Sequence, residues 1–112
     1  MDILTGSYER SVTTVTLAGR LDALEAGPLR TVLHEAIIDG QVNLVIDLSR
    51  VDFVDSAGLA ALVKGMKDAR RAGGDLQLIS PKSDDAMRVF ELTKFDQVFA
   101  MATDIESLFR DR

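Results

Sequence analysis

The sequence contains no cysteine and no tryptophan, and it has a single histidine, His34, and two prolines. The absence of cysteine excludes disulfide bonds, thiolate metal ligands and thiol redox chemistry, and it is compatible with a reducing compartment. No apolar run approaches the roughly 20 residues that a membrane span needs, and the first residues lack a basic segment followed by an apolar core. We therefore expect a soluble cytoplasmic protein without a signal peptide and without contact to a membrane.

Basic residues are also outnumbered, because the sequence has 13 Lys and Arg residues against 18 Asp and Glu residues, for a net charge of -5. Nucleic acids are bound by cations clustered on one face, so no direct nucleic-acid contact is expected. One local exception comprises Lys64, Lys67, Arg70 and Arg71. A solvated helix face is the simpler explanation of this run, and an acidic partner is the alternative.

Hydrophobic residues make up 46% of the 112 positions, which is enough for one packed core and predicts a single domain over residues 1–112. Alternating or continuous apolar runs predict strands at 3–8, 12–18, 43–48, 75–80 and 98–102. Apolar positions at helical spacing predict helices at 28–37, 59–69, 86–93 and from 105 onward. The order predicts an α/β fold with a four- to five-stranded mixed sheet and about four helices packed over it.

Several polar residues mark where these helices begin. Asp22 and Glu25 have the spacing of a capping box, but Pro28 is unfavourable inside a helix. We therefore start the first regular helix at Pro28 and leave Asp22 in the preceding loop, free to contact a ligand or partner. Ser83 is the expected N-cap of the third helix, and Thr103 to Glu106 has the capping-box spacing for the last one.

Ser56 occupies the junction between a buried strand and a helix, and we identify it as the functional residue. Partners and ligands of such sheets are met at the carboxyl ends of the strands, where the loops holding Asp22 and Ser56 are expected to be neighbours. Local physics leaves two roles open for Ser56, a helix N-cap or a functional hydroxyl. The functional role is supported by Gly58, which permits close approach of another surface, and by the flanking Asp52 and Asp55.

Catalytic and metal-binding alternatives are weaker. A serine hydrolase would need Gly-x-Ser-x-Gly and a histidine partner, whereas Val54 precedes Asp55-Ser56 and His34 sits on the edge of a helical face. A metal site from Asp47, Asp52 and Asp55 is conceivable, but acids at strand ends and turns usually cap backbone amides. No glycine-rich phosphate loop is present in the sequence. We therefore predict a non-enzymatic protein without a cofactor or metal.

Three motifs in order resemble the STAS domain of bacterial anti-sigma factor antagonists over nearly the whole chain. They are Gly19-Arg20-Leu21-Asp22, then Asp55-Ser56-Ala57-Gly58-Leu59 after the strand at 44–48, then Leu92-Thr93-Lys94-Phe95-Asp96. The resemblance implies that Ser56 is phosphorylated by a partner that is both an anti-sigma factor and a serine kinase. The unphosphorylated form would bind that partner and free the sigma factor, phosphorylation would abolish binding, and a serine phosphatase would reset the switch.

The resemblance also implies roles for the neighbours of Ser56. Asp22 is expected to contact the kinase, and the expected docking surface comprises Asp52, Asp55, Ala57, Gly58 and Leu59. The chain departs from the family where Ala60 replaces a frequent Gly or Arg and where Lys94 replaces a common glycine. We expect a monomer or weak dimer. The alternative is a STAS module that serves as a scaffold, a lipid-transport subunit or a small-ligand sensor.

Overall fold

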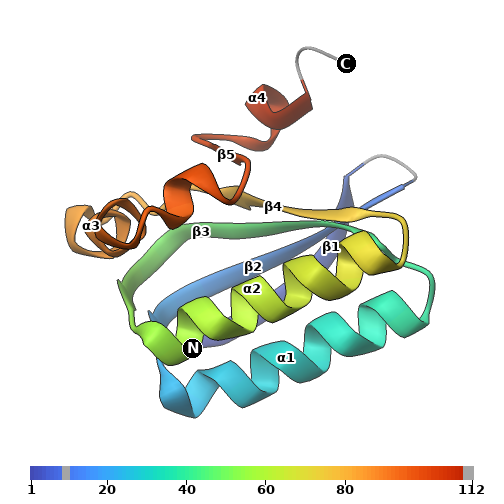
Figure 1. Ribbon diagram of the computed structural model, residues 1–112, viewed down its shortest axis with the longest axis horizontal. Coiled ribbons are helices and arrows are strands. Elements are labelled where there is room, and N and C mark those ends of the chain that lie inside the picture. The colour runs from blue at the N-terminus through green and yellow to red at the C-terminus, as the bar shows by residue number, and fades with distance from the viewer. Residues whose placement is uncertain (9–10, 110–112) are drawn as a thin grey trace.

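The computed structural model describes residues 1–8 and 11–109, which form an α/β fold around one five-stranded sheet (Figure 1). The strands are β1 (Asp2–Tyr8), β2 (Val12–Leu21), β3 (Asn43–Val54), β4 (Asp75–Ile79) and β5 (Met101–Ala102). Their order in the sheet is the order in the chain, with β1 antiparallel to β2 and every later pair parallel. The predicted mixed sheet is confirmed.

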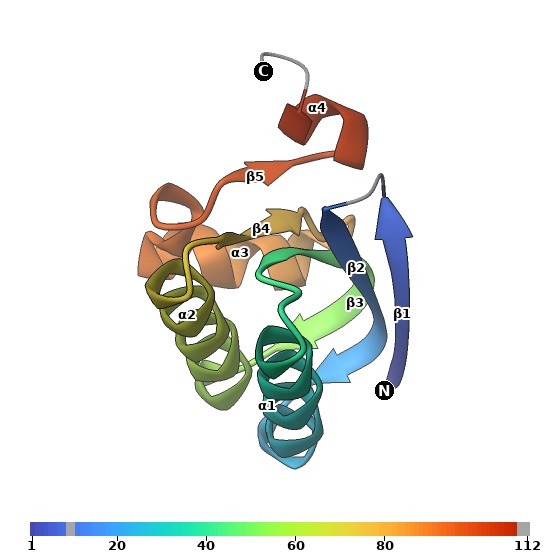
Figure 2. The same cartoon turned by 90° about the vertical axis from the view of Figure 1, so that its right-hand side faces the viewer.

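One α-helix follows each of the last four strands. They are α1 (Ala23–Ile38), α2 (Ser56–Arg71), α3 (Asp84–Thr93) and α4 (Ile105–Phe109), with a short 3-10 helix, η1 (Phe95–Gln97), after α3. Figure 2 shows α1 and α2 side by side on one face of the sheet. On the other face, α4 approaches β1, and the rings of Phe109 and Tyr8 stack with their centroids 5.7 Å apart. α1, α2 and α3 therefore pack against one face, and the short α4 covers part of the other.

The core lies between the sheet and the pair α1 and α2. Leu44, Ile46 and Leu48 of β3 are at most 1% exposed and belong to this core, whereas Val45 belongs to a smaller cluster on the opposite face. This division follows from the two-residue alternation of side chains along a strand. Phe90 of α3 completes the main cluster. The central strand is therefore apolar on both faces, as its sequence predicts.

The prediction that the first helix begins at Pro28 is wrong. Asp22 is the N-cap, and Pro28 lies inside the second turn of α1. Proline supplies no N–H for the carbonyl of Leu24, but Leu24 is 83% exposed and water can replace that donor. Gly27 precedes the proline and has no Cβ for the ring to meet. The combination of Gly27 with an exposed first turn therefore allows the helix to start early.

Several strand ends also differ from the prediction. β2 continues to Leu21 and β3 to Val54, so pairing reaches the functional junction. The last strand is shorter, because only Met101 and Ala102 pair with β4, whereas Phe99 turns inward and packs edge-on against Phe90 and Phe95.

The start of the last helix also differs. The carboxylate of Asp104 accepts a hydrogen bond from the N–H of Ser107 at 2.8 Å. The predicted pairing of Thr103 with Glu106 as a capping box is therefore wrong, because the capping oxygen comes from the next residue along the chain.

Candidate functional site

The loops that follow β2 and β3 lie side by side at one edge of the molecule (Figure 1). Leu21 and Val54, the last residues of the two strands, are register partners, and the N–H of Asp55 donates to the carbonyl of Leu21 at 3.2 Å. The predicted proximity of the Asp22 and Ser56 loops is confirmed. The N-termini of α1 and α2 therefore lie next to each other.

The loop after β4 joins this edge. The hydroxyl of Ser83 donates to the carbonyl of Asp52 at 3.5 Å and accepts from the N–H of Ala86 at 3.3 Å, which confirms Ser83 as the N-cap of α3. Asp52, Asp84 and Asp85 are exposed around it. Three loops thus converge on one edge, which carries exposed carboxylates.

Ser56 is the first residue of α2, and its side chain is exposed. The N-cap is Asp55, whose carboxylate accepts a hydrogen bond from the N–H of Gly58 at 2.9 Å. The capping role considered for Ser56 is therefore wrong, because the neighbouring aspartate fills it. Within the described part of the chain the Ser56 hydroxyl has no hydrogen-bond partner. The hydroxyl is thus free at the positive end of a 16-residue helix.

Asp22 is similarly occupied as a cap. Its carboxylate accepts from the N–H groups of Leu24 at 3.1 Å and Glu25 at 3.3 Å. The prediction that Asp22 is free in a loop is therefore corrected, although its side chain remains 21% exposed. A partner can reach the carboxylate only in the orientation that the cap imposes.

Gly58 and Leu59 are buried in the protein. Gly58 is buried, and a Cβ added there would lie 2.4 Å from the carbonyl oxygen of Leu21. Leu59 is 4% exposed and belongs to the core. Gly58 packs against the end of β2 and Leu59 leaves only a small part of its side chain exposed, so the contribution of these two residues to a docking surface stays a prediction. Ala57 is half-buried and Asp52 is exposed, so both remain accessible.

Arg20 and Phe53, for which the local sequence predicts no role, pair across β2 and β3. The Arg20 guanidinium lies 3.9 Å from the centre of the Phe53 ring, and its Nε is 3.6 Å from the Asp22 carboxylate. A cation over an aromatic face is held by the electrostatic field of the ring. This pair depends on the register between β2 and β3, which cannot be read from the local sequence pattern.

An apolar hollow of about 560 Å³ begins at Ser56 and runs between α2 and the segment that ends α3. It is lined by Ser56, Leu59, Ala60, Val63, Lys64, Lys67, Thr93 and Phe95. Thr93 and Phe95 flank Lys94, whose φ of 62° is the left-handed conformation that glycine adopts most easily. The motif at 92–96 is therefore adjacent to the serine motif in space, and Ala60 lies between them.

The basic residues of α2 are all exposed, as expected for a solvated face. Lys64 pairs with Asp68 at 2.7 Å, Arg71 approaches the same carboxylate at 3.7 Å, and Arg70 pairs with Asp75 at 2.9 Å. Lys67 forms no such pair with any residue placed in the structure. It is the basic residue of the run that is most available to a partner.

The acids considered for a metal site serve as backbone acceptors. Asp47 accepts from the N–H of Ser49 at 2.9 Å, and Asp55 caps α2. Among residues 1–8 and 11–109, no three His, Cys, Asp or Glu side chains are grouped as metal ligands. None of the described helices combines the length and apolar character needed to cross a membrane.

The fold and the site together define a small α/β domain with an exposed serine at a helix start beside an apolar hollow. The STAS domain family model matches residues 8–108, and the chain belongs to this family. It is 31% identical to the anti-sigma-B factor antagonist of Listeria monocytogenes serovar 1/2a over 75% of this chain and 73% of the relative.

Solved structures show the same fold. An anti-sigma factor antagonist from Mycobacterium paratuberculosis has a TM-score of 0.85 at 24% identity, over 98% of this chain and 92% of that one. SpoIIAA of Bacillus in its phosphorylated form has a TM-score of 0.74 at 23% identity, over 99% of this chain and 100% of that one. The predicted fold class is confirmed by both.

Proposed function

We propose that this protein is an anti-sigma factor antagonist that is switched by phosphorylation of Ser56. The unphosphorylated form binds an anti-sigma factor with serine kinase activity and so releases the sigma factor. Phosphorylation at Ser56 blocks this binding, and a serine phosphatase reverses it. Residues 1–112 act as one STAS domain in the cytoplasm, where transcription is regulated, and the chain contributes a phosphate acceptor rather than catalysis.

The observation that carries this proposal is the free, exposed hydroxyl of Ser56 at the first position of α2. A kinase requires an accessible hydroxyl, and a docking protein requires accessible surface beside it. The adjacent hollow provides such a surface, with Val63 and Phe95 among its apolar residues. The name of the Listeria relative and the phosphorylated structure of SpoIIAA support the same role.

The position of Ser56 explains how a phosphate can alter binding without unfolding the protein. A phosphate adds about -1.5 to -2 charges near neutral pH. At an exposed helix N-terminus this charge is favoured by about 0.3–1 kcal/mol, so the fold tolerates it. At the interface the same dianion, beside the exposed Asp52, resists removal from water when a partner covers the hollow. Phosphorylation therefore lowers the affinity for the partner and leaves the fold intact.

Phosphorylation and binding can be measured separately. The protein is incubated with ATP and the anti-sigma factor kinase of its source organism, and the phosphate is located by mass spectrometry. We expect one phosphate, on Ser56, in the wild type and in Ser83→Ala, and none in Ser56→Ala. Titration calorimetry should show near-wild-type affinity for Ser56→Ala and at least about a tenfold loss for Ser56→Asp.

Two results would contradict the proposal. One is phosphate on another residue with Ser56 unmodified, and the other is full affinity of Ser56→Asp for the anti-sigma factor. Binding of a lipid or small ligand, with no binding to any anti-sigma factor, would instead support the alternative STAS module. The Ser83→Ala control separates a requirement for Ser56 from a general effect of altering this edge.

A further inference from the structure

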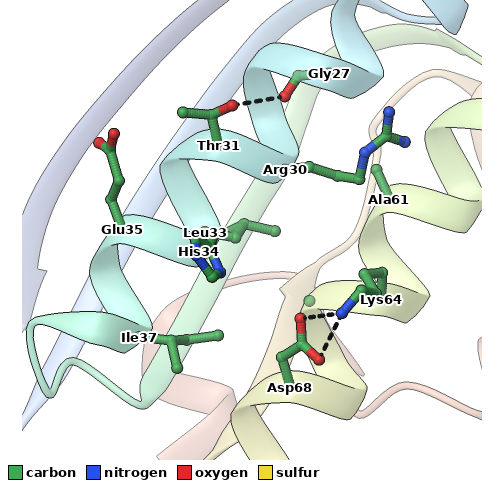
Figure 3. A pocket seen from close by; sticks show the side chains of 11 residues that line it. Gly27, Arg30, Thr31, Leu33, His34, Glu35, Ile37, Ala61, Lys64 and Asp68 are labelled. Carbon is green, nitrogen blue, oxygen red and sulfur yellow. Dashed lines mark hydrogen bonds and ion pairs between the residues drawn. The ribbon is translucent and has the colours of Figure 1, made fainter.

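A second hollow, of about 480 Å³, lies between α1 and α2 on the surface that faces away from the sheet (Figure 3). Its floor is apolar, with Leu33 and Ala61 almost fully buried and Ile37 half-buried. A Cβ on Gly65 would lie 2.6 Å from Leu33 Cδ1, so the helices approach closely there. The floor of this groove is therefore formed by tightly packed helices.

The groove carries both signs of charge, with Arg30, Lys64 and Arg71 as cations and Glu35 and Asp68 as acids. Arg30 reaches from α1 toward α2, and within the described residues it makes no hydrogen bond or ion pair (Figure 3). Lys64 rises from the opposite wall, and His34 lies between them along α1. A ligand in the groove therefore meets cationic groups from both helices.

The acids of the groove do not cancel this charge. Asp68 accepts from Lys64 at 2.7 and 2.8 Å and is 3.7 Å from Arg71, so two cations already balance it. Glu35 points away from α2 in Figure 3. Arg30 therefore has no acidic partner, and the local excess of charge is positive.

The groove is elongated. A smaller hollow of about 300 Å³ shares His34, Ile37, Lys64 and Asp68 with it and extends it to Ala72. From Ala61 to Ala72 the wall formed by α2 is about 16 Å long, or three helical turns. Ile38, which is 68% exposed, lies at the far end. This length fits a short helix better than a compact small molecule.

We infer that the groove between α1 and α2 binds an acidic amphipathic helix of a partner protein. The apolar face of such a helix packs on Ile37 and Ile38, and its carboxylates face Arg30 and Lys64. Amphipathic helices are recognised in this way when an apolar groove meets their anchors and rim charges select their sequence. The inference goes beyond the proposed switch, because it does not require phosphorylation of Ser56.

The test uses a capped peptide of about 14 residues with Leu at helical spacing and Glu elsewhere, and a matched peptide with Lys in place of Glu. Amide shifts of the labelled protein in NMR spectra are followed during titration. We expect the acidic peptide to cause shifts centred on Arg30, His34 and Lys64, and we expect the basic peptide to cause none there. Raising the salt concentration should weaken this binding.

Charge reversal supplies matched variants. Arg30→Glu combined with Lys64→Glu should weaken peptide binding by about tenfold or more, whereas Lys82→Glu combined with Arg88→Glu, which changes net charge equally, should retain it within about twofold. Arg30→Glu alone should show an intermediate loss without disturbing the Lys64 ion pair. Ser56→Asp should bind the peptide like wild type, which separates this inference from the proposed switch.

Four outcomes would overturn the inference: no binding of the acidic peptide, equal binding of the basic peptide, shifts confined to another surface, or equal loss in both charge-reversal variants. Two further measurements identify a different occupant. Saturable binding of dodecanoate without peptide binding would assign the groove to small amphipathic anions. A dimer that dissociates on Arg30→Glu in sedimentation equilibrium would assign it to a second copy of the chain.

Discussion

Replacement of Gly58 by alanine should destabilise the protein, although alanine is normally the better helix former. The added Cβ would lie 2.4 Å from the carbonyl oxygen of Leu21 and 2.7 Å from its Cγ. Ordinary carbon–oxygen contacts are about 3.3 Å or longer, so α2 or the end of β2 has to move by about 1 Å. The same carbonyl accepts the N–H of Asp55, and that hydrogen bond would be strained as well.

The magnitude follows from three contributions. Overpacking of a tight core costs about 1–3 kcal/mol, and a backbone neighbour places this case near the upper end. Weakening of the hydrogen bond from Asp55 to Leu21 adds up to about 1 kcal/mol. Alanine in place of glycine returns about 1 kcal/mol of helix stability. We expect a net loss of about 2–3 kcal/mol, which corresponds to about 8–12 °C in the melting temperature.

Urea denaturation followed by circular dichroism measures this loss, and Gly65→Ala is the matched control. Gly65 is also buried in α2, but its added Cβ would meet the flexible tip of Leu33 at 2.6 Å rather than backbone. The control should lose less than about 1 kcal/mol after the gain in helix stability. If Gly58→Ala is as stable as wild type, or no less stable than Gly65→Ala, the packing explanation for Gly58 is refuted.

Three further predictions concern helix ends, each measured by thermal or urea unfolding. Ser56→Asp should unfold within about 1 kcal/mol of wild type, because the charge lies at an exposed helix start, and a larger loss would contradict that placement. Asp55→Ala should lose about 1 kcal/mol with its cap, Asp55→Asn should recover most of it, and an unchanged alanine variant would exclude the capping role. Lys94→Gly should gain up to about 1 kcal/mol by relieving a left-handed lysine, whereas Lys67→Gly inside α2 should lose about that amount; losses in both would contradict the strain at Lys94.

Much of the fold was predictable because local patterns encode it. Side-chain alternation marked the hairpin of β1 and β2, and the continuous apolar run of β3 marked a central strand. Ser83 was predicted as an N-cap from its position before an acidic turn, and the structure confirms it. The place of Ser56 between a strand and a helix was visible for the same reason. These features depend on neighbours within a few residues.

Prediction was wrong where two local signals competed. Pro28 and the capping box of Asp22 indicate different helix starts, and the structure resolves the conflict through Gly27 and the exposed Leu24. Asp55 and Ser56 are adjacent residues that can each cap a helix, and the sequence pattern did not distinguish them. In both cases the error concerns the residue at which a helix begins, α1 in the first case and α2 in the second.

The sequence by itself determined the order of strands and helices, the apolar faces that form the core, and a serine at the junction between β3 and α2. Tertiary structure decided which residues share a surface with that serine. Pairing of β2 with β3 placed Arg20 on Phe53, and packing of α2 against Leu21 turned Gly58 inward. Both depend on strand register and helix crossing, which join residues more than 30 positions apart and leave no trace in local periodicity.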